Sequence, residues 1–225
     1  MKQTMTLAGI ILAFALCLAS CNGNVPNEYC EELVQLAEDG NAEAQCNLAE
    51  CYADGEGVEQ NNEEAFKWYM KAAEQGLAVA QSNVGVCYKQ GWGVEINKEE
   101  GFKWIMKAAE QGLADAQLFL GDCYSDGIGT SENPQEAIKW YRKAAEQGIA
   151  EAQYWIGVYY RDGIGTSVNP QEAFKWLKKA AEQGNADAQI DLSTCYILGI
   201  GVEKDRDKAN YWSSKAVEQA LQNGY

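Results

Sequence analysis

The side chains best suited to covalent chemistry in this chain of 225 residues are its eight cysteines, and no histidine is present to activate them. Histidine is the commonest general base, the usual activator of a serine or cysteine nucleophile and the commonest metal ligand. The sequence also lacks the Gly-x-Ser-x-Gly, Ser-x-x-Lys and Gly-x-x-x-x-Gly-Lys segments that place a nucleophile or hold a phosphate. We therefore expect a protein that is not an enzyme and that uses no cofactor or metal.

Four cysteines share one position of a period of 36 residues: Cys51, Cys87, Cys123 and Cys195. Equivalent positions of stacked repeats lie about 10 Å or more apart, whereas a disulfide needs Cα atoms within about 7 Å, so we expect these four to be buried thiols. Folding the first hairpin about residues 40 and 41 brings Cys30 level with Cys51. Two interpretations stay open, a Cys30–Cys51 disulfide in an oxidising compartment or two buried thiols with Cys46 exposed.

The charge balance argues against nucleic acid as a partner. The chain has 18 Lys and Arg residues against 33 Asp and Glu residues, a formal net charge of −15. Nucleic-acid binders gain much of their affinity from clustered Lys and Arg, and no such cluster occurs. With 47% hydrophobic residues the chain is expected to fold, and its function is expected to come from a surface.

The first residues are typical of an export signal. Lys2 precedes an apolar stretch over residues 7–18, which is too short to span a membrane comfortably and has the length of a signal-peptide core. Leu18-Ala19-Ser20-Cys21 resembles the lipobox of bacterial lipoproteins. The resemblance implies a signal peptide over residues 1–20, a lipid on Cys21, and a tether over residues 21–27 of about 23 Å when extended. The alternative is ordinary secretion, with Cys21 an incidental thiol. Because Asn22 is not the retention signal Asp, the outer membrane is expected.

The rest of the chain repeats one unit five times, over residues 42–77, 78–113, 114–149, 150–185 and 186–221. Glutamine, tyrosine and tryptophan each recur at intervals of 36 residues, at Gln45, Gln81, Gln117, Gln153 and Gln189; at Tyr52, Tyr88, Tyr124, Tyr160 and Tyr196; and at Trp68, Trp104, Trp140, Trp176 and Trp212. Gly-x-Gly pairs keep the same period. These glycine pairs follow a helix and lack a third spaced glycine, so we interpret them as turns and not as phosphate-binding loops.

Each unit is predicted to be a pair of helices. In the first unit, Ala44, Leu48, Cys51 and Tyr52 form one apolar stripe at helical spacing, and Gly55 suits a left-handed C-terminal cap. Asn61 and its equivalents can cap the second helix, and prolines stand at the first helical position in two units. Residues 28–40 align with a lone second helix that would cap the stack. The expected fold is all-α, a right-handed superhelix of five αα hairpins over residues 41–225.

These motifs resemble the Sel-one-like repeat, a tetratricopeptide-related αα hairpin with a pattern close to Ala-Gln…Leu-Gly-x-x-Tyr-x-x-Gly-x-Gly-Val…Lys-Ala-x-x-Trp-Tyr-x-Lys-Ala-Ala. The resemblance covers residues 42–221. Departures are local, such as Val84 in place of leucine and Gly101 in place of alanine. The resemblance implies a non-enzymatic scaffold or adaptor.

Positions where the five units differ indicate where a partner binds. Stacked repeats bind partners through the positions that are not needed for stacking. On the first helices one such position holds Asn47, Asn83, Phe119, Trp155 and Asp191, and the next turn holds Glu50, Val86, Asp122, Val158 and Thr194. An aromatic and aliphatic patch in the middle repeats, rimmed by Asp122 and Asp191, is predicted from Phe119, Trp155, Val86 and Val158 with Leu118 and Tyr154 beside them. The alternative is that Leu118, Tyr154 and Trp155 only tighten local packing. Trp92, between two loop glycines, is a further candidate whose alternative role is loop packing.

The sequence therefore predicts a lipid-anchored scaffold of the bacterial cell envelope that binds a protein or peptide on its first helices. Membrane contact would be through the lipid on Cys21, and a small molecule is not the expected partner. The alternative function is a receptor for a glycan or peptidoglycan fragment, with Trp155, Phe119 and Trp92 stacking on sugar faces.

Overall fold

The computed structural model describes residues 27–222. All regular elements among these residues are helices, which confirms the all-α solenoid of five 36-residue repeats. In chain order they are α2 (Asn27–Glu38), α3 (Ala42–Asp54), α4 (Asn62–Glu74), α5 (Ala78–Gln90), α6 (Lys98–Glu110), α7 (Ala114–Asp126), α8 (Pro134–Glu146), α9 (Ala150–Asp162), α10 (Pro170–Glu182), α11 (Ala186–Leu198) and α12 (Arg206–Gln222). The predicted signal peptide, Cys21 and most of the tether lie outside the described residues.

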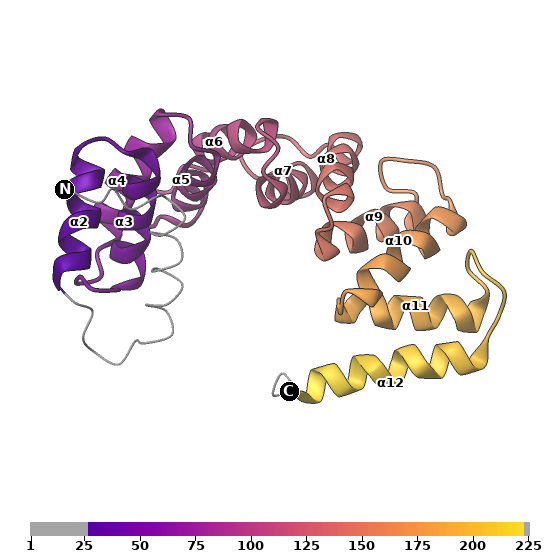
Figure 1. The fold of residues 1–225 in the computed structure, drawn as a ribbon. Coiled ribbons are helices and arrows are strands. Elements are labelled where there is room, and N and C mark those ends of the chain that lie inside the picture. Colours follow the sequence, from indigo (N-terminus) through magenta and orange to yellow (C-terminus); the bar gives the residue numbers. More distant parts are fainter. Residues whose placement is uncertain (1–26, 223–225) are drawn as a thin grey trace, which may run out of the picture.

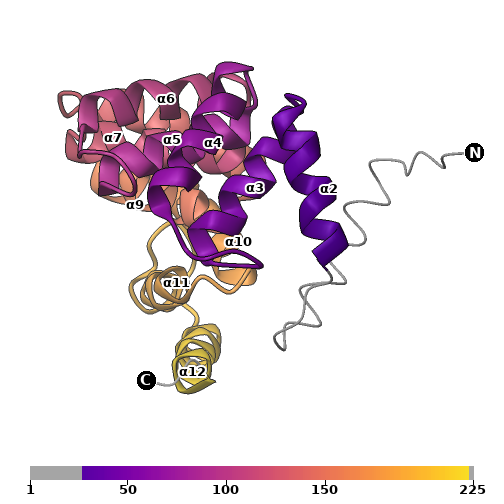
Figure 2. The same cartoon turned by 90° about the vertical axis from the view of Figure 1, so that its left-hand side faces the viewer.

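The helices stack in sequence order, each against the helix before it and the helix after it. The stack curves into an arch with α2 at one end and α12 at the other (Figure 1), and a view from the side shows the same two ends (Figure 2). In the described part of the chain, no helix combines the length and the apolar character that crossing a membrane requires.

The helix boundaries follow from local side-chain chemistry. The Asn133 side chain accepts a hydrogen bond from the Glu136 N–H at 3.1 Å, and Asn61, Asn97 and Asn169 cap α4, α6 and α10 in the same way. Pro134 begins α8, where its missing N–H costs no helical hydrogen bond. At the other boundary, Gly55 ends α3 with φ of 75°. The predicted caps are confirmed.

The recurring glutamine is a buried connector between helices. The Gln117 Nε2 on α7 donates to the Ala109 carbonyl of α6 at 3.1 Å, and its Oε1 accepts from the Gln147 Nε2 at the end of α8 at 2.8 Å. Each of these glutamines on a first helix is at most 6% exposed. The same bridge joins a glutamine pair in every unit, with donor and acceptor exchanged in the last pair: Gln45–Gln75, Gln81–Gln111, Gln153–Gln183 and Gln189–Gln219. In the first unit, α2 supplies the acceptor, because Gln45 donates to the Ala37 carbonyl.

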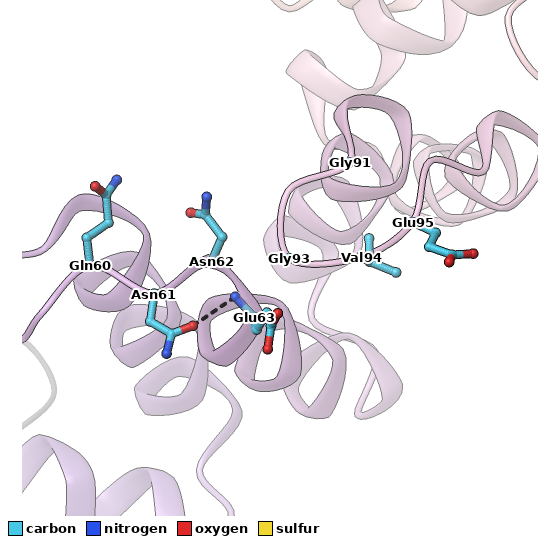
Figure 3. A pocket seen from close by; sticks show the side chains of 8 residues that line it. All are labelled: Gln60, Asn61, Asn62, Glu63, Gly91, Gly93, Val94 and Glu95. Carbon is cyan, nitrogen blue, oxygen red and sulfur yellow. Dashed lines mark hydrogen bonds between the residues drawn. The ribbon is translucent and has the colours of Figure 1, made fainter.

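The second glycine of each later Gly-x-Gly pair is needed because two backbones meet there. Figure 3 shows the loop at Gly93 lying against Asn62 at the start of α4. A Cβ on Gly129 would lie 2.1 Å from the Lys98 carbonyl oxygen at the start of α6, and Gly201 has the same relation to Pro170. The loop after each first helix therefore packs on the second helix of the preceding repeat.

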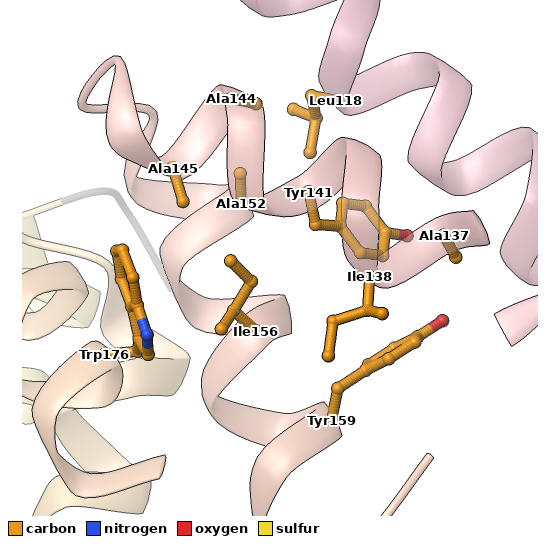
Figure 4. Close-up of a cluster of buried hydrophobic side chains, with 10 residues drawn as sticks. All are labelled: Leu118, Ala137, Ile138, Tyr141, Ala144, Ala145, Ala152, Ile156, Tyr159 and Trp176. Carbon is orange, nitrogen blue, oxygen red and sulfur yellow. The ribbon is translucent and has the colours of Figure 1, made fainter. Parts of the chain in front are cut away.

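The core continues from one repeat to the next. Figure 4 shows Tyr141 of α8, Ile156 of α9 and Trp176 of α10 in one buried cluster, so a single hairpin does not bury its own apolar stripe. The periodic tryptophans are buried or half-buried, and a lysine three residues along lies over the ring. For Trp104, the Lys107 Nζ is 3.7 Å from the ring centroid. This cation–π contact covers the outer side of the ring.

Candidate protein-binding face

The surface predicted to bind a partner is formed by the solvent side of α3, α5, α7, α9 and α11, called the first-helix face below. In Figure 1, α7 lies toward the inside of the arch, whereas α6 and α8 lie toward its outside. Most of the predicted residues keep some exposed surface on this face. Asn83, Val86, Phe119, Asp122, Tyr154, Trp155 and Asp191 are all half-buried.

Two predicted residues belong to the core instead. Leu118 is 6% exposed and Val158 is 7% exposed, so neither offers surface to a partner. Leu118 packs in the same cluster as Tyr141 and Ala144, as drawn in Figure 4. The alternative of local packing therefore holds for Leu118. Trp92 lies on the loop directly after α5, where its N–H donates to the Cys87 carbonyl, and 54% of its surface is exposed.

An aromatic group on α9 is part of the first-helix face. The Trp155 ring stacks on Tyr141 of α8, with ring centroids 6.4 Å apart and an interplanar angle of 18°. Tyr154 lies beside it, with centroids 5.2 Å apart. Because Trp155 is supported from below and only half-buried, it is held in place and still presents ring surface to solvent.

Asp122 of α7 sits next to this aromatic group in a partly dehydrated site. Its Oδ1 accepts a hydrogen bond from the Tyr141 hydroxyl at 2.8 Å. Burial raises the pKa of Asp122 to about 6; the Tyr141 hydrogen bond and Lys89 act against this rise, and Glu151 and Asp126 add to it. Next to it, the Tyr159 hydroxyl donates to the Ser125 Oγ at 3.0 Å. Sequence reasoning found Asp122 and missed its partner Tyr141 and the neighbouring pair of Tyr159 and Ser125.

The Asp122→Asn variant is expected to gain stability over the wild type as pH rises. Because the carboxyl pKa is higher in the folded state than in an unfolded chain, its protonation stabilises the fold fully below about pH 4, and that contribution is lost as pH rises through about 6. Asparagine keeps the acceptor for Tyr141 without the charge. Urea unfolding at several pH values between 4 and 8 measures the difference. Asp115→Asn removes an exposed carboxylate seven residues earlier on the same helix and is the matched control. A difference between wild type and Asp122→Asn that is constant over this pH range would contradict the assignment.

Arg161 joins two first helices across the face. Its guanidinium donates to Asp162 on α9 and, through Nη1, to the Asp191 Oδ2 on α11 at 2.6 Å. The hydrogen bond from Arg161 also lowers the pKa of Asp162. Sequence reasoning named Asp191 as a rim residue and missed this arginine. The sequence did contain a signal for this arginine, because Lys89 on α5 and Arg161 on α9 are the two cationic residues of the first helices.

An apolar patch on α11 was also missed. Ile190, Ile197 and Leu198 are 55%, 57% and 57% exposed, and their spacing puts them on one side of the helix. The positions equivalent to Ile197 and Leu198 on the other first helices hold small, polar or charged residues, such as Lys89 and Asp126. Exposed apolar groups of this size often mark interaction sites. The α11 patch, defined by these three residues, extends the first-helix face toward the C-terminal end of the stack.

The cysteines on the first helices, Cys46, Cys51, Cys87, Cys123 and Cys195, are buried. Burial raises the pKa of the Cys87, Cys123 and Cys195 thiols to about 11, which makes them poor nucleophiles at neutral pH. Cys46 is 3% exposed, which corrects the interpretation in which it was exposed. It packs with Tyr69 and Val84 of the neighbouring helices. The structure describes the backbone of Cys30 in α2 but not its side chain, so the bridge to Cys51 stays a prediction.

A shallow depression of about 850 Å³ lies between the start of α4 and the loop after α5 (Figure 3). Its lining is polar, with Gln60, Asn62, Glu63 and Glu95 around the backbone of Gly93. No group of three or more Cys, Asp or Glu side chains in residues 27–222 is arranged to hold a metal ion.

The sequence matches the model of the Sel1 repeat family at residues 42–77, 78–113, 114–149, 150–185 and 186–221. A Sel1 repeat protein from Oxalobacter formigenes is similar in structure, with a TM-score of 0.84 and 37% identity over 93% of this chain and 85% of that one. A protective antigen of uropathogenic Escherichia coli is also similar in structure, with a TM-score of 0.76 and 34% identity over 87% of this chain. The match covers about half (49%) of the antigen. An immunity protein from Pseudomonas aeruginosa shares the fold alone, with a TM-score of 0.62 and 22% identity over 100% of this chain and 86% of that one. No curated protein sequence matches. Because the family model covers all five repeats, the chain belongs to the Sel1 repeat family.

Proposed function

We propose that this protein is a scaffold that holds a protein or peptide partner on its first-helix face. Sel1-repeat proteins are generally protein-interaction scaffolds, and the family is typically non-enzymatic. The observation that carries the proposal is Trp155, a supported and half-exposed ring at a position that holds asparagine or aspartate in three of the five repeats. Stacking of the repeats therefore does not require a tryptophan there, whereas binding surfaces favour rigid aromatic anchors.

The location is part of the same proposal and rests on the sequence alone. A lipid on Cys21 would anchor the protein in the cell envelope, at the outer membrane where two membranes exist. The short tether over residues 21–27 would keep the repeats close to the bilayer. Palmitate labelling of the wild type and of Cys21→Ala tests the anchor, since only the wild type would carry the label.

Replacing Phe119 and Trp155 together by alanine is expected to weaken partner capture by roughly 2 kcal/mol or more, about thirtyfold, because buried aromatic anchors dominate interfaces. The measurement uses a photo-crosslinking amino acid at position 83, a half-buried position of α5 on the first-helix face, with position 146 on a second helix as control. Glu146 is exposed on α8 and lies outside the first helices. Circular dichroism checks that the double variant keeps its helices.

A discrete crosslinked protein at position 83 that is absent at position 146 and lost in the double variant supports the scaffold. Equal crosslinking at both positions would contradict it. The glycan-receptor alternative is tested separately by adding muropeptides while tryptophan fluorescence is followed. A fluorescence change that requires Trp155 would favour that alternative.

A further inference from the structure

The two sets of helices carry charge of opposite sign. The five first helices together carry ten carboxylates and two cations, a net charge of −8. The five second helices, α4, α6, α8, α10 and α12, carry twelve carboxylates and fourteen cations, a net charge of +2. The acidity of these helices is therefore concentrated on the face that the proposed function assigns to the partner.

The ten carboxylates also share one stripe. They occupy four positions of the repeat, spaced as i, i+4, i+7 and i+11, which lie on one side of an α-helix. The stripe consists of Glu43, Glu50, Asp54, Asp115, Asp122, Asp126, Glu151, Asp162, Asp187 and Asp191. Every first helix except α5 contributes at least two of them, so the stripe runs along most of the stack.

Within the stripe, the carboxylates act on one another. Besides burial, Asp54 raises the pKa of Glu50, and Glu151 and Asp126 raise that of Asp122. Of the two cations, Arg161 is already engaged by Asp162 and Asp191. The second helices differ, because Glu64, Glu100 and Glu136 each pair with a lysine three residues along at 2.6 Å. The first-helix face thus keeps a negative field that the chain itself leaves largely uncompensated.

Two further features narrow the kind of partner. The rings of Tyr154 and Trp155 lie among these carboxylates, where an arginine or lysine side chain can contact a ring face and a carboxylate together. The α11 patch then offers exposed apolar surface at one end of the stripe. A neutral glycan would gain no electrostatic attraction from ten carboxylates, and a polyanion would be repelled.

We propose that the partner held on the first-helix face is a polypeptide segment rich in lysine and arginine, with apolar side chains at the end that reaches the α11 patch. This inference rests on the proposed function and specifies its partner. The cationic side chains of the segment lie along the carboxylate stripe, and one of them contacts the Trp155 ring. The apolar end sets the direction in which the segment lies.

Binding of a basic peptide tests the inference. The probe is a fluorescein-labelled peptide of about 15 residues that alternates lysine and serine, roughly 50 Å when extended, and its counterpart has glutamate in place of lysine. Fluorescence anisotropy with the purified protein at low and physiological salt measures affinity. We expect binding of the lysine peptide alone, weakened by salt because exposed charges are screened.

Two variants that lose the same number of negative charges test whether the peptide binds the first-helix face or responds only to the acidity of the whole protein. The triple variant Asp115→Asn, Asp122→Asn, Glu151→Gln is expected to bind the lysine peptide at least about tenfold more weakly. The control Glu74→Gln, Glu110→Gln, Glu146→Gln removes the same charge from exposed sites on second helices and is expected to change affinity less than about twofold. Equal losses in both triples, or no binding at low salt, would overturn the inference. If crosslinking from position 83 still captures a protein in that case, the scaffold stands and only the basic partner is wrong.

The direction is tested by adding two leucines to one end of the lysine peptide. This addition is expected to tighten binding to the wild type and to the control variant Ile96→Ser. Ile96 lies on a loop and is 64% exposed. The added leucines are expected not to raise the affinity of the Ile197→Ser variant for the peptide, because that substitution removes apolar surface from the α11 patch. A leucine effect that is the same in both variants would refute the assigned direction.

Discussion

Gly129→Ala is expected to destabilise the protein by roughly 2–5 kcal/mol. The residue has φ of 69°, which strains any residue with a Cβ, and that Cβ would lie 2.1 Å from the Lys98 oxygen and 2.7 Å from its carbonyl carbon. Both contacts are with backbone, which cannot swing away as a side chain can. The loop after α7 must therefore lift from α6, and the contact between the second and third repeats opens.

Gly148→Ala is the matched control. Gly148 also has a positive φ, of 100°, and a Cβ there would meet nothing within 4 Å. Its cost is expected to be the conformational strain alone, about 1–2 kcal/mol. Urea unfolding measures both variants, and amide hydrogen exchange shows whether protection is lost first around α6 and α7. Equal costs would mean that the backbone contact at Gly129 does not matter for stability.

Gln117→Leu is expected to cost about 2–3 kcal/mol although leucine fills a similar volume. The change removes the donor to the Ala109 carbonyl and the acceptor for Gln147 from a site that is 5% exposed. Three helices lose their common link, because the two hydrogen bonds join α6, α7 and the end of α8. A polar group left unpaired in the interior also keeps its desolvation penalty.

The control for this substitution is Gln135→Leu on the exposed start of α8, which is expected to change stability by less than about 0.5 kcal/mol. Chemical unfolding followed by circular dichroism measures both variants. A Gln117→Leu protein as stable as the control would show that packing, and not hydrogen bonding, fixes this glutamine. Because repeats interact mainly with their neighbours, the unfolding curve should also be broader than that of the wild type.

The fold could be predicted because identical residues recur at one spacing. Gln117, Tyr124 and Trp140 have equivalents in every repeat, and a period of 36 residues fits two helices and two turns. Caps such as Asn133 were predictable for the same reason, since they depend on nearby backbone alone. What the glutamines do was not predictable, because their partners belong to different helices.

The candidate site was predicted less completely. The burial of Leu118, Val158 and Cys46 depends on how far each hairpin turns relative to the next, and a linear pattern does not contain that angle. The links from Tyr141 to Asp122 and from Arg161 to Asp191 join helices at positions that do not repeat. Variation among repeats therefore located the surface, whereas three-dimensional packing decided which side chains remain on it.

The glutamine bridges also bear on how such a protein can change its size in evolution. Each repeat offers an alanine carbonyl to the following glutamine, and α2 offers the Ala37 carbonyl to the first repeat in the same way. A duplicated or deleted unit of 36 residues would meet matching groups at both of its new junctions. The gene can therefore lengthen or shorten the arch in whole steps, and the reach of its inner surface can follow the size of what it holds.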